Sequence, residues 1–136
     1  MTKKMLAATV LFFCGIAVGR AVQPAPSKVY EMRTYTAADG KFDAVNARFR
    51  DHTVKLFEKH GMKNIGYWTP MEGPTAGTTL IYIIEHASRE QAKANWAAFS
   101  KDPEWQKAKA ASEVNGRIVA KAESVFLTAT DYSPIK

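Results

Sequence analysis

Cysteine is almost absent from this chain, because the one cysteine, Cys14, lies in an apolar segment near the N-terminus. The rest of the sequence therefore has no disulfide bond, no thiolate nucleophile and no sulfur ligand for a closed zinc site. Its stability must come from packing within the domain or against a partner subunit.

A long hydrophobic run is also missing. The apolar segment from Met5 to Val18 has 14 residues, whereas a membrane-spanning helix needs about 20. Lys3 and Lys4 precede this segment and small residues around Gly19–Ala21 follow it, which is the layout of a secretory signal peptide. We expect residues 1–21 to be such a signal, so that the protein is exported, periplasmic or secreted, with no stable membrane anchor after cleavage. A retained signal anchor is the alternative.

Cleavage leaves about 115 residues, enough for one compact domain and too few for two. We interpret the Pro-containing residues 22–27 as a tether, residues 28–130 as the folded domain and residues 131–136 as a C-terminal tail. No internal repeat divides the domain further.

Blocks of like charge are lacking in the mature chain. The full sequence has a formal net charge of +6, but loss of Lys3, Lys4 and Arg20 reduces its 19 basic residues to 16, against 13 acidic ones. Both signs are interspersed, as on an ordinary solvated surface. We therefore expect no nucleic-acid partner.

Familiar catalytic motifs are absent as well. The sequence contains no GxSxG, P-loop, dinucleotide-binding or HExxH motif, and no two of His52, His60 and His86 are three or four residues apart. We expect no metal site and no cofactor. His60 ends an apolar helical stripe, where it favours the helix C-terminus. His86 ends a predicted strand on the same face as Tyr82, so these two residues are the candidates for acid–base catalysis.

Several segments do predict regular structure. The pattern predicts strands near 28–36, 62–68, 79–86 and 117–128. A first helix is capped by Asp39 or Gly40 and ends at His60 and Gly61. A second helix follows the capping box Ser88-x-x-Gln91, and a further short helix is capped by Asp102 and has Pro103 in its first turn. Trp96 lies in the middle of the second helix's apolar stripe, Ala92 to Phe99. We assign it to the core.

The order strand, helix, strand, strand, helix, strand is typical of a ferredoxin-like α+β fold. In this fold a four-stranded antiparallel sheet carries its helices on one face. An uncovered apolar face favours association with a second copy of the chain.

Four segments carry a resemblance to a known family: Tyr30–Tyr35 (YEMRTY), Phe49–His52, Phe57–Trp68 (FEKHGMKNIGYW) and Asp102–Trp105 (DPEW). Together they resemble the NIPSNAP domain over nearly all of the mature chain. The resemblance implies a dimeric α/β barrel, in which two ferredoxin-like sheets face each other around a lumen. The resemblance does not imply a particular reaction, because NIPSNAP proteins have no agreed activity. Relatives in the wider superfamily include cofactor-free monooxygenases, EthD-like proteins, isomerases and haem-degrading enzymes.

The first strand carries two opposite charges, Glu31 and Arg33, on one face. Lys121 and Glu123 share a face of the last strand, which is the antiparallel neighbour of the first in this fold. If the helices cover the other face, all four charges point into the dimer lumen. They then form either a cross-strand ion-pair ladder or a polar anchor in which Arg33 binds a ligand oxygen.

We therefore predict an exported homodimer of uncharacterised activity that binds a small apolar or aromatic molecule in its lumen. The candidate ligand-binding residues are Glu31, Arg33, Tyr35, Tyr67, Trp68, Lys121 and Glu123. One alternative is a cofactor-independent monooxygenase or isomerase, with Arg33 orienting an enolate or phenolate and His86 or Tyr82 moving a proton. The other is a purely structural dimer or interaction module.

Overall fold

A computed structural model describes residues 27–136. The predicted signal peptide and most of the predicted tether lie outside the described residues. The elements are β1 (Val29–Ala37), α1 (Phe42–Arg48), the π-helical segment η1 (Phe49–Thr53), α2 (Val54–Lys59), β2 (Lys63–Trp68), β3 (Thr79–His86), α3 (Arg89–Lys101), α4 (Pro103–Ser112) and β4 (Val119–Leu127).

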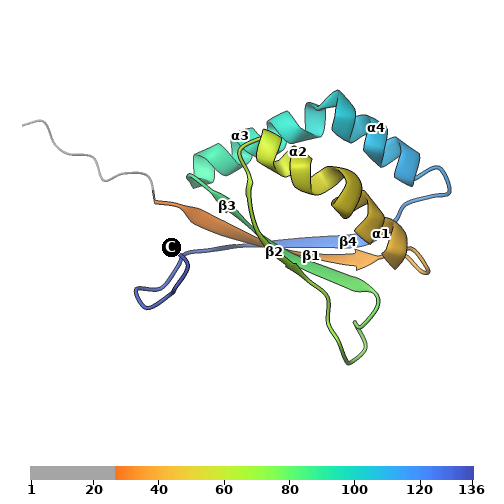
Figure 1. The fold of residues 1–136 in the computed structure, drawn as a ribbon, viewed down its shortest axis with the longest axis horizontal. Coiled ribbons are helices and arrows are strands. Elements are labelled where there is room, and N and C mark those ends of the chain that lie inside the picture. Colours follow the sequence, from red (N-terminus) through yellow and green to blue (C-terminus); the bar gives the residue numbers. More distant parts are fainter. Residues whose placement is uncertain (1–26) are drawn as a thin grey trace, which may run out of the picture.

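The four strands form one antiparallel sheet in the order β2-β3-β1-β4. The helices lie together on one side of this sheet, and the C-terminal segment turns back on the other side (Figure 1). The prediction of a ferredoxin-like α+β fold with helices on one face is confirmed. We call the helix-covered side the inner face and the opposite side the outer face.

The first helical stretch is interrupted where the sequence predicted one continuous helix. Its middle turn, η1, is π-helical, and the Thr53 hydroxyl there donates to the Arg48 carbonyl at 3.2 Å. Its start also differs, since Lys41 precedes α1 without any side-chain cap, and Gly40 has a φ of +69°. The predicted stop is confirmed, because Gly61 has a φ of +75°.

Two predicted caps begin the helices α3 and α4. The Ser88 hydroxyl accepts the Gln91 N–H at 3.0 Å, and the Asp102 carboxylate accepts the Glu104 N–H at 2.8 Å. Each cap satisfies a backbone donor that its helix leaves free, which is why α3 and α4 begin where the sequence predicts.

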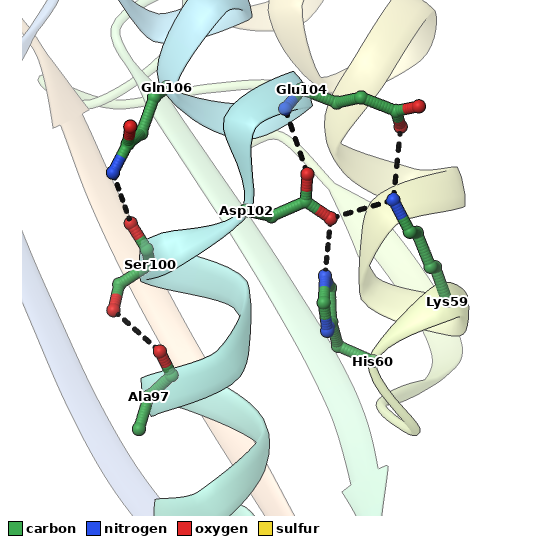
Figure 2. Close-up of polar contacts among 7 residues, drawn as sticks. All are labelled: Lys59, His60, Ala97, Ser100, Asp102, Glu104 and Gln106. Atoms are coloured by element: carbon green, nitrogen blue, oxygen red, sulfur yellow. Dashed lines mark hydrogen bonds and ion pairs between the residues drawn. The ribbon is translucent and has the colours of Figure 1, made fainter.

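Asp102 also ties the end of α2 to the start of α4 (Figure 2). Its second oxygen lies 2.9 Å from Lys59 Nζ and 2.6 Å from His60 Nε2, both at the end of α2. The Lys59 and His60 contacts, with the Glu104 N–H, outweigh burial and hold the pKa of Asp102 below its usual range. His60, which the sequence places at the C-terminus of its helix, therefore also contacts the residue that caps the start of α4.

The core lies between the inner face and the helices and is rich in aromatic rings. Tyr82 is fully buried, and its ring packs 5.4 Å from Tyr35 and 5.4 Å from Tyr67, measured between centroids. Phe49 and Phe57 join the same cluster. Interlocked rings of this kind fix the sheet against α1 and α2.

The outer face has no helix over it and exposes both apolar and charged side chains, Trp68 and Val125 as well as Lys121 and Glu123. Trp68 is 52% exposed and lies across Gly66, where a Cβ atom would come within 2.5 Å of the indole. Glycine is thus required at position 66 for the indole to lie flat on the sheet. No helix among residues 27–136 has the length and apolarity for a membrane crossing, and these residues contain no cluster of three or more potential metal ligands.

Candidate functional site

The charged residues of β1 lie on the inner face. Glu31 pairs with Ile84 and Arg33 with Tyr82 across the β1–β3 ladder, and both partners are buried under the helices. The expectation that this pair points into a space between two sheets is therefore wrong. Glu31 and Arg33 are accommodated between the sheet and the helices because the Trp96 indole of α3 contacts both of them.

The charged residues of β4 lie on the opposite side of the sheet. Lys121 pairs with Thr36 and Glu123 with Thr34, whereas Ser124 pairs with Arg33. Lys121 and Glu123 instead contact each other at 2.9 Å, with side chains that are 64% and 53% exposed. The four charges predicted to converge are thus split between the two faces.

The aromatic candidates are separated in the same way. Tyr35, Tyr67 and Tyr82 belong to the core cluster of the inner face, while Trp68 lies on the outer face. The three tyrosines and Trp68 therefore lie on opposite faces of the sheet among the described residues. Whether any of them binds a ligand stays a prediction.

Glu31 is the centre of a buried polar cluster. One carboxylate oxygen accepts from Arg33 Nη1 at 2.8 Å and from Ser124 Oγ at 2.6 Å. The other accepts from Trp96 Nε1 at 2.6 Å and contacts His86 Nε2 at 3.0 Å. Glu31 itself is only 1% exposed. Four side chains from β1, β3, α3 and β4 therefore meet at one carboxylate.

These contacts decide the charge of Glu31. Burial by itself raises its pKa, but hydrogen bonds from His86, Ser124 and Trp96 and the charge of Arg33 outweigh burial and lower the pKa to about 2. Glu31 is consequently an anion at neutral pH, and its negative charge is compensated by Arg33 next to it.

Arg33 also has an aromatic contact. Its guanidinium carbon lies 4.3 Å from the centroid of the Trp96 ring and 5.6 Å from that of Tyr35. Trp96 thus holds both members of the charged pair, one by its N–H and one by its ring. Sequence reasoning missed Trp96 and Ser124, since an indole in an apolar stripe shows its role only when the strand beneath it is known.

The predicted acid–base candidates are enclosed. His86 is 1% exposed and contacts Glu31 through Nε2, while its Nδ1 has no partner among residues 27–136. The Tyr82 hydroxyl is likewise buried and unpartnered in this part of the chain. Burial raises the pKa of Tyr82, so its phenol is protonated at neutral pH. A catalytic role for either residue stays a prediction.

A cleft opens between α3 and β4 directly above Glu31. Its volume is about 540 Å³, within the range of small-molecule sites. Its lining residues are Glu31, Arg89, Glu90, Lys93, Trp96 and Phe126. The Arg89 guanidinium carbon lies 3.4 Å from the centroid of the Phe126 ring. We call this space the α3–β4 cleft.

Removal of the Glu31 charge gives a pH-dependent loss of stability. At pH 7 we expect Glu31→Gln to lower the free energy of unfolding by about 1–3 kcal/mol, because charge-assisted hydrogen bonds are lost. The pKa of Glu31 is about 2 in the folded state, below the ordinary value of 4.5. As the pH falls, Glu31 is therefore protonated in the unfolded chain before it is protonated in the folded one. The stabilisation is complete above about pH 5 and disappears as the pH falls towards 2. Urea unfolding of both proteins from pH 7 to pH 2 measures this difference.

Glu123→Gln is the matched control, because Glu123 is a half-exposed acid on the other face of the sheet. Its effect is expected to stay within about 0.5 kcal/mol at every pH. A Glu31→Gln difference that does not change with pH would contradict the assigned role of the buried charge.

Comparison with known proteins places this arrangement in a family. The NIPSNAP family model matches residues 30–134. A NIPSNAP family protein from Agrobacterium tumefaciens is 21% identical with a TM-score of 0.69, over 80% of this chain and 99% of that one. An uncharacterised NIPSNAP domain protein from Burkholderia xenovorans is 24% identical with a TM-score of 0.65, over 78% and 98%.

A more distant structure has a different functional description. It is a proposed antibiotic biosynthesis monooxygenase from Nitrosomonas europaea, 12% identical with a TM-score of 0.52, over 74% of this chain and 97% of that one. At these identities the structures show the shared fold and no more. A comparison with curated proteins found no significant match. The family match covers most of the chain and agrees with the fold, and the protein belongs to the NIPSNAP family.

Proposed function

We propose that this NIPSNAP domain binds a small aromatic molecule with an acidic group in the α3–β4 cleft. The observation that carries the proposal is the buried Glu31 cluster at the floor of a cleft with a cationic and aromatic rim. This differs from the lumen site predicted from the sequence, because Glu31 and Arg33 lie under α3.

The charges of the cleft favour an anion at its rim. At the floor, Arg33 compensates Glu31. At the rim, Arg89 and Lys93 lie one helical turn apart on α3. Neither of them forms an ion pair among residues 27–136, and Glu90 beside them forms none either. Two cations against one anion leave the rim positive, and a carboxylate suits an arginine fork.

The walls favour a flat ring. Trp96 and Phe126 line the cleft from α3 and from β4, and hydrogen bonding to Glu31 fixes the Trp96 indole. A fixed aromatic wall costs little conformational entropy on binding. An aromatic body packed against Trp96 leaves its acidic group next to Lys93 and Arg89, whose guanidinium lies over the Phe126 ring.

Binding is better supported than catalysis. A general base is most effective with a pKa near the working pH, whereas the pKa of Glu31 is about 2. Glu31 therefore suits a fixed counter-charge better than a proton carrier. The likeness to the proposed monooxygenase concerns the fold alone.

The test uses 2-naphthoate as the probe and isothermal titration calorimetry. We expect one saturable site per chain, with affinity reduced about three- to tenfold by Arg89→Gln or by Lys93→Gln, and reduced further at high salt. The neutral analogue 2-naphthamide is expected to bind more weakly than the acid.

Lys121→Gln is the control for this titration, because Lys121 is an exposed lysine on the outer face. It is expected to leave the affinity unchanged. Equal losses in all three variants, or tighter binding of the amide, would refute an anion site at the α3–β4 cleft.

We further propose that the outer face joins two copies into a homodimer. Val125 and Leu127 are 51% and 37% exposed, and Trp68 projects from the same face. These apolar residues lie on the two edge strands, β2 and β4, of the face that has no helix over it, and exposed apolar side chains on one sheet face favour a self-complementary contact. The family resemblance, which implies a dimeric α/β barrel, supports the same arrangement.

The oligomeric state tests this interface. Val125→Lys is expected to convert a dimer into a monomer in light scattering coupled to size-exclusion chromatography, because it places a charge in the contact. Val114→Lys is the matched control, since Val114 is 75% exposed and follows α4, away from the sheet. A wild-type protein that is monomeric at 100 μM would exclude the proposal.

Export is proposed from residues 1–21 alone, on the pattern of Lys3 and Lys4 followed by an apolar run. A mature chain that begins near Val22 is expected in the periplasm or the medium. Intact-mass measurement of the exported fraction determines this, and a full-length chain in the membrane fraction would favour the retained anchor.

A further inference from the structure

One edge of the sheet, formed by β4, has no neighbouring strand. β4 is the last member of the order β2-β3-β1-β4, and its nine residues, Val119–Leu127, pair only with β1 among residues 27–136. In an antiparallel pair, alternate residues direct their N–H and C=O groups to one neighbour, and the residues between them direct theirs to the other side. Alternate residues of β4 therefore offer unpaired donors and acceptors along this edge.

The two edges of the sheet differ in their protection against a further strand. β2, at the opposite edge, has six residues, and its register with β3 shifts between Asn64 and Gly66. A short strand and an irregular register both protect an edge. The pairing of β4 with β1 is regular from Lys121 to Leu127, and β4 contains no proline. The charged residues of β4, Lys121 and Glu123, pair with each other on the outer face. β4 is therefore the edge that can accept another strand.

The free edge of β4 borders the α3–β4 cleft. Phe126 lines the cleft, and Ser124 and Ala122 follow it on the inner face of β4. Arg33, which lies against the Trp96 ring, is paired across the β1–β4 ladder with Ser124. Ser124 and Ala122 are small and exposed, so no large side chain of β4 separates this part of the edge from Trp96. The cleft is open towards a chain that lies beside β4.

The cations of the cleft lie near the C-terminal end of β4. The Arg89 guanidinium carbon lies 3.4 Å from the centroid of the Phe126 ring, and Phe126 is the last residue but one of β4. Lys93 lines the same cleft. A peptide whose terminal carboxylate lies next to these cations, and whose preceding residues follow the edge, runs parallel to β4.

From these observations we infer that the acidic aromatic molecule bound in the α3–β4 cleft is the C-terminal residue of an extended peptide, which adds to the free edge of β4 as a further strand. A C-terminal phenylalanine, tyrosine or tryptophan carries both the ring that packs against Trp96 and the carboxylate that binds Arg89 and Lys93. The preceding residues form main-chain hydrogen bonds with β4, which give affinity without requiring particular side chains. The inference rests on the proposed function, because it uses the same cleft.

Strand addition at β4 is compatible with the proposed homodimer. The hydrogen-bonding groups of an edge strand point sideways, in the plane of the sheet, whereas side chains stand above and below it. Val125 and Leu127 stand on the outer face. A copy of the chain that packs on this face contacts their side chains and does not use the groups that the peptide needs.

The probe is the peptide acetyl-TSVTF with a free C-terminal carboxylate, compared with N-acetylphenylalanine by isothermal titration calorimetry. Both ligands end in the same residue, so we expect the peptide to bind about tenfold more tightly because of its main-chain hydrogen bonds. Arg89→Gln is expected to weaken both ligands about three- to tenfold, since both place a carboxylate at the rim. Hydrogen–deuterium exchange is expected to slow at alternate amides of β4 with the peptide and not with N-acetylphenylalanine.

Two N-methylated forms of the peptide are the matched controls. Methylation of the second and fourth amide nitrogens removes donors from one side of an extended chain, and methylation of the third and fifth removes them from the other side. Only one of the two forms is expected to lose the tenfold gain. Equal affinities of the two forms, or a peptide that binds no more tightly than N-acetylphenylalanine, would overturn strand addition and leave the small-molecule site standing. If neither N-acetylphenylalanine nor 2-naphthoate bound, the proposed function would fail together with this inference.

Discussion

A buried carboxylate imposes the strongest constraint on this structure. Glu31 lies between the sheet and α3, where an unpaired charge costs several kcal/mol of folding free energy. It is accommodated because four side chains from β1, β3, α3 and β4 point at its two oxygens. The hydrogen bond from Trp96 to this carboxylate therefore holds α3 over β1, a central strand of the sheet.

The position of α3 in turn produces the α3–β4 cleft. β4 is largely exposed, so the edge of the inner face is open beside the helix. Trp96 faces this opening, with Arg33 against its ring and Glu31 at its N–H. The same contacts that stabilise the fold thus hold the Trp96 indole in place as one wall of the α3–β4 cleft.

The two faces of the sheet carry different chemistry. The inner face combines a buried ion pair with a cationic rim, whereas the outer face presents Trp68, Val125 and the exposed Lys121–Glu123 ion pair. The two faces can differ in chemistry because successive side chains along each strand point to opposite faces of the sheet. A small NIPSNAP domain has room for two chemically distinct surfaces on one sheet.

The sequence by itself determined the order of elements and the fold, because these follow from local signals such as the caps at Ser88 and Asp102 and the stop at Gly61. It also showed that Glu31 and Arg33 share a face. Only the tertiary structure decided which face, since that depends on a partner 65 residues away, the indole of Trp96. The register of β1 with β4 was equally undetermined, and a shift of one residue exchanges Ser124 for Glu123 beside Arg33. Both the choice of face and the strand register depend on long-range hydrogen bonds, which leave no periodic pattern in the sequence.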